Sequence, residues 1–190
     1  MYLFFDTETT GLPKSFKAPV SDLDNWPRLV QLAWQNYDAQ GNLLASFNYI
    51  IKPNGFIISD EVAKIHRITQ ARAEAEGVEL EPVLTEFVEH LNKNEFAVAH
   101  NFSFDENIVG SELLRAKMEN IFERIRKICT MKGTVNVCQI PGARGYKWPN
   151  LTELHKYLFQ KDFAEAHDAE ADVKALANCF FGLKRRGLIF

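Results

Sequence analysis

Five acidic and imidazole side chains could do chemistry together, and they fall in three short segments of the chain. Asp6 and Glu8 stand near the start, Asp105 near the middle, and His167 and Asp172 near the end. Carboxylates held close together repel one another, so a cluster of this kind needs cations to be tolerated. Several hard oxygen ligands suit Mg²⁺ or Mn²⁺, whereas zinc prefers nitrogen and sulfur. These residue types therefore indicate a two-metal hydrolytic site.

The first segment places two carboxylates where a strand ends. Tyr2–Phe5 is a short apolar run that predicts a central strand, and Asp6 and Glu8 follow it two residues apart. That spacing points both carboxylates to one face of the sheet and Thr7 to the other. Most Asp-x-Glu pairs are solvated surface acids, so this pair alone is a weak signal. Gly11 would allow a tight turn, and Leu12 would either stack on a base or pack in the core.

The other two segments lie at helix starts. Asp105 is expected three or four residues into a helix that follows a strand at 96–99, where it could also serve only as a favourable charge at the helix N-terminus. Asn101 occupies the corner before that helix and could be only a turn or cap residue. Asp168 is a suitable N-cap for the last helix, which leaves His167 in the loop before it. A loop histidine beside carboxylates can exchange protons, as a general base must.

The remaining pattern predicts the elements that position these residues. Apolar runs predict antiparallel strands at 29–34 and 43–51, a strand at 96–99 and a weaker one at 126–130. Helical spacing runs from Ser59, which can cap a short helix, to Asn92, and recurs after residue 101 and over 169–186. Three strands followed by alternating helix and strand predict an α/β fold, with a mixed sheet flanked by helices.

Composition limits the kind of protein this can be. A chain of 190 residues, 46% hydrophobic, is expected to form a single domain over 1–190. Its net charge of −3 argues against a strong, sequence-independent grip on long duplex DNA. No apolar run reaches the about 18 residues of a membrane helix, and no cationic region precedes the first apolar stretch. A cytoplasmic protein without membrane contact is expected.

In order and spacing, the three segments resemble the three exonuclease motifs of the DEDD superfamily, in the branch whose third motif contains histidine. That group includes proofreading subunits of bacterial DNA polymerase III (epsilon), ribonuclease T and the animal Trex enzymes. The resemblance covers Tyr2 to about Leu183. Ile65–Thr69 is similar to the family's Ile-His-Gly-Ile-Thr segment, and Trp148–Leu151 contains its Pro-x-Leu before a helix.

The resemblance implies a ribonuclease-H-like fold and 3′→5′ hydrolysis of nucleic acid to nucleoside 5′-monophosphates. It implies that two Mg²⁺ ions, for which Mn²⁺ would substitute, are held by four ligands: Asp6, Glu8, Asp105 and Asp172. His167 would deprotonate the attacking water, and the catalytic set would be these four acids with His167. The positions matching those that line the terminal nucleotide are Thr9, Thr10, Leu12, His66, Asn101 and Phe104.

The chain departs from the family pattern at two points and in one loop. Arg67 replaces the usual glycine, and Cys129 stands where many members have aspartate. The segment Pro13–Pro27, with Trp26 and Arg28 at its end, would be either a cover over the substrate or a solvated insertion.

The expected substrates are single-stranded or frayed 3′ ends, with DNA favoured. RNA 3′-end trimming, and a proofreading-type subunit acting with a polymerase, remain alternatives. A non-enzymatic tethering module would be expected to lack a ligand or the histidine, and all five residues are present. The biological substrate, the pathway, the role of the 13–27 loop, and any polymerase or homodimer contact stay open.

Overall fold

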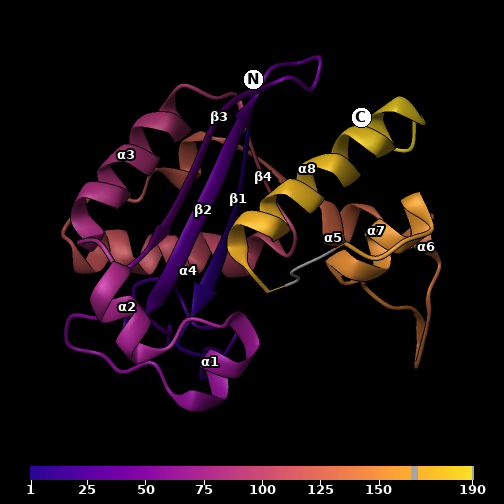
Figure 1. The fold of residues 1–190 in the computed structure, drawn as a ribbon. Coiled ribbons are helices and arrows are strands. Elements are labelled where there is room, and N and C mark those ends of the chain that lie inside the picture. The colour runs from indigo at the N-terminus through magenta and orange to yellow at the C-terminus, as the bar shows by residue number, and fades with distance from the viewer. Residues whose placement is uncertain (164–166, 190) are drawn as a thin grey trace.

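The structure is a computed structural model and describes residues 1–163 and 167–189. A five-stranded sheet runs through the centre of the fold (Figure 1), in the order β3-β2-β1-β4-β5. Its strands are β1 Tyr2–Thr9, β2 Leu29–Tyr37, β3 Leu43–Ile50, β4 Phe96–Ala99 and β5 Arg126–Cys129. β1 pairs antiparallel with β2 and parallel with β4, β2 pairs antiparallel with β3, and β4 pairs parallel with β5. The expected mixed α/β sheet flanked by helices is confirmed.

Helices and one hairpin complete the described part of the chain. The longer helices are α3 Leu80–Asn92, α4 Phe102–Arg115, α7 Leu151–Phe159 and α8 Ala169–Arg185. The shorter ones are α1 Asp60–His66, α2 Gln70–Glu76, the 3₁₀ turn Ile121–Arg124, α5 Thr130–Gly133 and α6 Val135–Cys138. Between α6 and α7, β6 Pro141–Gly142 and β7 Gly145–Tyr146 form a separate two-stranded hairpin.

Alternation along β1 divides the core into two layers. Leu3 and Phe5 are buried against α3 and α4, in a cluster that includes Phe87 and Ile108. Phe4 faces the opposite way, toward α8. In Figure 1, α8 crosses the sheet on the viewer's side, while α1 and α2 lie by the carboxyl end of β1. Because the period is two, Asp6 and Glu8 continue the face beneath α8, and Thr7 continues the face beneath α4.

Several element boundaries differ from those expected. β1 continues from Phe5 to Thr9 because pairing with β2 persists along the polar residues, as Glu8 faces Gln31 in the register. The helical stretch over 59–92 is three helices, broken where Arg67 and Gly77 end α1 and α2. Ser59 occupies the N-cap of α1, but its side chain makes no capping hydrogen bond. The hairpin and the helices α5 and α6 are too short for periodicity to reveal them.

Within residues 1–163 and 167–189, no helix is both long and apolar enough to cross a membrane.

Candidate active site

Three of the five predicted catalytic residues converge directly at the carboxyl end of β1. Possible ligand atoms of Glu8, His167 and Asp172 all lie within 4.8 Å of one another. The backbone N–H of His167 also donates a hydrogen bond to Asp172 Oδ2, at 3.1 Å. Because α8 begins at Ala169 and packs over β1, its first turn brings Asp172 to the face that carries Asp6 and Glu8.

The N-terminus of α8 is fastened to the sheet by a side chain that the sequence patterns did not single out. Gln31 on β2, only 2% exposed, accepts a hydrogen bond from the Ala169 N–H at 3.2 Å. Its amide nitrogen lies 3.4 Å from Asp168 Oδ2. Asp168 caps α8 as expected, since its Oδ1 accepts from the Glu170 and Ala171 N–H groups. Gln31 therefore helps to position the first turn of α8, and with it Asp172, relative to the carboxylates of β1.

Asp105 lies on the first turn of α4, as expected, and is 2% exposed. Its Oδ1 accepts two hydrogen bonds from Thr7, one from the N–H at 3.1 Å and one from the Oγ1 hydroxyl at 2.7 Å. Thr7 can reach Asp105 because it points to the α4 face of β1. The strand alternation placed Thr7 on that face, but only the docking of α4 shows what it contacts. The two bonds from Thr7 hold one carboxylate oxygen of Asp105 in place.

The four carboxyl groups have raised pKa values, and burial is the largest cause for each. Burial and then the nearby Asp105, Asp172 and Glu8 carboxylates hold the pKa of Asp6 well above its ordinary value. Burial and repulsion from Asp172 raise the pKa of Glu8 from 4.5 to about 8. Burial also raises the pKa of Asp105 and Asp172, opposed by the hydrogen bonds from Thr7 and His167 respectively.

This electrostatic pattern fits divalent cations. Near neutral pH, ionising all four carboxyl groups in the protein alone costs free energy, because the carboxylates are buried and repel one another. Bound cations would offset this cost. The donors are carboxylate oxygens with one imidazole, a set suited to Mg²⁺ or Mn²⁺. The residues present therefore fit the cations that the sequence predicted.

His167 is exposed and has a left-handed backbone, with φ 69°. That conformation is uncommon for a residue with a Cβ and often marks a functional position. It turns the chain so that the His167 N–H faces Asp172 while the ring stays open to solvent.

Some of the predicted substrate-binding side chains are exposed to solvent, and others are buried or bonded within the protein. Leu12 is 75% exposed, which excludes the core-packing alternative for it. Phe104 is half-buried against the core, and its ring centroid lies 6.5 Å from that of the exposed Phe16. Thr9 is buried and donates to the Gly11 carbonyl at 2.6 Å, so its hydroxyl shapes the turn.

His66 and Asn101 are less open than the pattern alone suggested. His66 is 3% exposed, and its Nδ1 accepts from the Ile68 N–H at 3.1 Å. Burial lowers the pKa of His66, which an interaction with the Thr9 main chain partly opposes. Asn101 is the N-cap residue of α4, with φ 69°, but its side chain makes no cap hydrogen bond.

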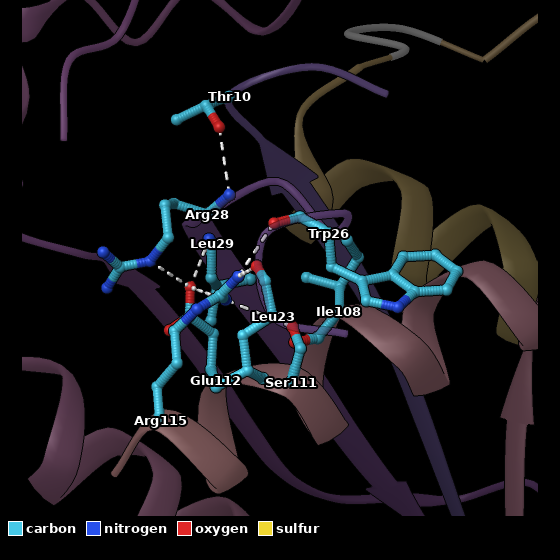
Figure 2. Close-up of polar contacts among 9 residues, drawn as sticks. All are labelled: Thr10, Leu23, Trp26, Arg28, Leu29, Ile108, Ser111, Glu112 and Arg115. Carbon is cyan, nitrogen blue, oxygen red and sulfur yellow. Dashed lines mark hydrogen bonds and ion pairs between the residues drawn. The ribbon is translucent and has the colours of Figure 1, made fainter. Parts of the chain in front are cut away.

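Thr10 contacts the Glu112 cluster, the group of ionic side chains Arg28, Glu112 and Arg115, which anchors the end of the 13–27 loop. Its Oγ1 accepts from the Arg28 N–H at 3.0 Å (Figure 2), and its own N–H donates to the Arg28 carbonyl. Glu112 on α4 is fully buried, and its Oε1 accepts from Arg28 Nε at 2.8 Å and from the Leu29 N–H at 3.0 Å. Arg115 Nη1 lies 3.1 Å from the same oxygen.

The same cluster extends into the loop itself. Arg115 Nη2 donates to the carbonyls of Leu23 and Trp26, at 2.6 and 2.8 Å, as Figure 2 shows. Trp26 is 3% exposed and belongs to the core between the sheet and α4. The end of the loop is therefore tied to α4, whereas residues 14–17 lie exposed to solvent.

Comparisons with known proteins agree with this geometry. The family model RNase_T, described as Exonuclease, matches residues 3–180. Among solved structures, the zinc-bound complex of *E. coli* exonuclease I with single-stranded DNA matches with a TM-score of 0.75 at 18% identity. The match covers 97% of this chain and 40% of that one.

A second solved structure gives the same result. *E. coli* exonuclease I in complex with a dA16 oligonucleotide has a TM-score of 0.77 at 18% identity, over 97% of this chain and 41% of that chain. At such low identity the likeness establishes the fold alone. The chain spans about two fifths of the length of these proteins. No curated protein matches the sequence.

Proposed function

Since the chain belongs to the Exonuclease family of the DEDD superfamily, we propose that it is a metal-dependent 3′→5′ exonuclease that degrades single-stranded DNA to nucleoside 5′-monophosphates. The observation that carries this proposal is the meeting of Glu8, His167 and Asp172 within 4.8 Å. Asp105 is close enough to raise the pKa of Glu8, and Asp6 is close enough for its neighbours to raise its own pKa. We assign the whole activity to a single domain of the histidine-containing branch.

Asp6, Glu8, Asp105 and Asp172 would hold two Mg²⁺ ions, or Mn²⁺ in their place. When bound, such ions offset the carboxylate charge, promote ionisation of water and stabilise the leaving oxygen. The role of Asp105 would depend on Thr7, whose two hydrogen bonds orient its carboxylate.

His167 would act as the general base. Its exposed ring can reach a water molecule next to Glu8 and Asp172 and accept a proton from it. The water oxygen then bonds to the phosphorus of the phosphodiester that joins the terminal nucleotide to the preceding one. At the same time, the bond from this phosphorus to the 3′ oxygen of the preceding nucleotide breaks. That 3′ oxygen takes up a proton, and the imidazolium returns its proton to solvent. One 5′-monophosphate leaves, and the shortened strand keeps a free 3′ hydroxyl.

The open side chains near the turn after β1 favour an unpaired end. Leu12 and Phe104 offer apolar surfaces on which the terminal base could stack, and Phe16 adjoins Phe104. Unstacking a paired end costs a few kcal/mol. Single strands and frayed ends should therefore be degraded faster than blunt, matched duplexes.

The decisive experiment is digestion of 5′-labelled DNA and RNA of matched sequence, single- and double-stranded, with Mg²⁺ or with EDTA. We expect a ladder shortening from the 3′ end, 5′-monophosphates as products, no reaction in EDTA, and a block by a 3′-phosphate. Asp6→Ala should be inactive, whereas Glu89→Ala on the exposed side of α3 should match the wild type.

Internal cuts, or an Asp6→Ala protein with substantial Mg²⁺-dependent activity, would overturn the proposal. If the RNA strand is digested faster than the DNA strand, the proposed substrate is RNA and not DNA. That discrimination rests on a 2′-hydroxyl contact.

A further inference from the structure

The β6–β7 hairpin carries two large aromatic side chains that are open to solvent. Its strands pair Pro141 with Tyr146 and Gly142 with Gly145. Tyr146 is 51% exposed, and Trp148, two residues after it along the chain, is 61% exposed. In Figure 1 the chain between α6 and α7 extends outward, beyond the helices on either side. Exposed aromatic rings offer faces on which a nucleic-acid base can stack.

The charge of the hairpin is also distinctive in a chain of net charge −3. Arg144 lies in its turn and is exposed, and within the described ranges it has no acidic partner. Lys147 follows Tyr146 and forms an ion pair with Glu153 on α7. Cations interleaved with exposed aromatic rings form a surface that suits a single nucleic-acid strand, since rings stack on bases and cations contact phosphates.

The base of the hairpin is anchored to the edge of the sheet that carries the carboxylates. His100, which follows β4, lies with Nε2 3.0 Å from the Pro149 carbonyl oxygen and with Nδ1 2.9 Å from Thr130 Oγ1. Burial lowers the pKa of His100 to about 4, so the ring acts as a neutral bridge. The next residue, Asn150, closes a capping box with Glu153 at the start of α7. Trp148 thus directly precedes two residues whose positions are fixed by hydrogen bonds, Pro149 and Asn150.

We propose that Tyr146, Trp148 and Arg144 bind the substrate strand on the 5′ side of its terminal nucleotide. This inference rests on the proposed function, because a strand whose 3′ end lies among the carboxylates must leave the site across neighbouring surface. The contact is insensitive to base sequence, because every base has a face that can stack. It would hold a shortened strand near the site between successive cleavages.

The test compares substrates that can and cannot reach the hairpin. Wild type, Trp148→Ala, Tyr146→Ala and Tyr157→Ala are assayed on oligothymidylates of about 3 and about 15 nucleotides. Tyr157 on α7 is the matched control, because it is 43% exposed but lies outside the hairpin. We expect KM for the long strand to rise roughly 5- to 100-fold in the two hairpin variants, as loss of one stacked base implies.

For the short strand, KM and kcat should stay as in the wild type, and Tyr157→Ala should change neither. Trp148→Phe should recover most of the affinity because it keeps a stacking ring. An equal loss on both lengths would mean that the change disturbs the sheet edge through Pro149, and would overturn the proposal. An unchanged KM on the long strand would overturn it too, and would leave the hairpin to another kind of partner.

Binding without cleavage separates this inference from the proposed function. Fluorescence anisotropy with a labelled 15-nucleotide strand in EDTA should give a weaker Kd for Trp148→Ala and for Arg144→Gln. The Arg144→Gln difference should shrink as salt is raised, since it reflects a phosphate contact. A wild type that binds through the hairpin yet never cleaves would refute the nuclease proposal alone. Equal Kd values for all variants would refute the hairpin proposal alone.

Discussion

Individual side chains at this site differ in what holds them. Asp105 is fixed by two hydrogen bonds from Thr7, whereas His167 is exposed and contacts Asp172 through its backbone N–H. A ligand that must keep one geometry gains from such support, since the partners of ligand groups orient them. A group that must exchange protons with water gains from exposure.

The first residue-scale prediction concerns His167. His167→Ala should lower kcat by roughly 10²–10⁴, the usual contribution of a general base. Steady-state rates at saturating Mg²⁺ check this. A variant with the wild-type rate would exclude His167 as the base.

The second concerns Thr7. Thr7→Val keeps the shape of the side chain but removes the 2.7 Å hydrogen bond to Asp105 Oδ1. Loss of such a supporting contact typically weakens metal affinity or activity by about 10- to 100-fold. Activity titrated against Mg²⁺ should show a higher half-saturation concentration.

Thr85→Val is the matched control for this change, because Thr85 is exposed on α3 and, among the residues that the structure describes, its hydroxyl bonds only to the Glu81 carbonyl of its own helix. An unchanged Mg²⁺ titration for Thr7→Val would mean that the backbone N–H alone suffices to orient Asp105.

At the scale of elements, the junction of α1 with the loop after it explains one unusual feature of the sequence. Arg67, at the position of the usual glycine, ends α1 with a left-handed backbone, φ 63°. Glycine adopts this conformation without strain, whereas other residues do so at a cost of about 1 kcal/mol. The unusual residue therefore keeps the geometry that glycine would supply.

Replacing Arg67 tests this explanation. Arg67→Gly relieves the strain but makes the unfolded chain more flexible, so the free energy of unfolding should stay level or rise by up to about 1 kcal/mol. Lys64→Gly inside α1 should instead lower it by about 1 kcal/mol. Urea denaturation measures both. A clear loss for Arg67→Gly would show that its side chain stabilises the corner.

The Glu112 cluster joins α4 to the start of β2 and the 13–27 loop. Glu112→Ala would leave Arg28 and Arg115 without their shared carboxylate, and removal of one partner of a buried pair costs about 3–5 kcal/mol. Both arginines are partly exposed, so the lower figure is expected. Glu119→Ala, which breaks the exposed pair with Arg124, should cost less than about 1 kcal/mol.

Denaturant unfolding of the two variants makes the comparison. Equal losses would mean that burial adds nothing to the Glu112 cluster.

For the whole molecule, the carboxylate cluster should make stability depend on metal and pH. Because the folded pKa of Glu8 is about 8 against an ordinary 4.5, the folded state holds this proton more tightly than the unfolded state between those values. Stability in EDTA should therefore fall as pH rises through this window. Buried histidines with lowered pKa have the opposite effect, but only below about pH 7.

Between pH 7 and 8 the effect of Glu8 is therefore separated from that of the histidines, and the free energy of unfolding in EDTA should fall by about 1 kcal/mol. Mg²⁺ should abolish the fall, and Asp172→Asn should weaken it, because the Asp172 carboxylate is the neighbouring charge that raises the pKa of Glu8 most. Urea unfolding at both pH values, with and without Mg²⁺, provides the measurement. A level or rising stability in EDTA would contradict the clustered, uncompensated carboxylates.

The sequence by itself determined the central strand, the shared face of Asp6 and Glu8, the place of Asp105 on its helix and Asp168 as a cap. These features depend on periodicity and on local capping, which act over a few residues. Tertiary structure alone decided the rest. The bonds from Thr7 to Asp105 and from Arg28 to Glu112 join positions 98 and 84 residues apart, which no local pattern encodes. Likewise, only the tertiary structure showed that Leu12 is exposed and that Arg115 on α4 holds the end of the 13–27 loop.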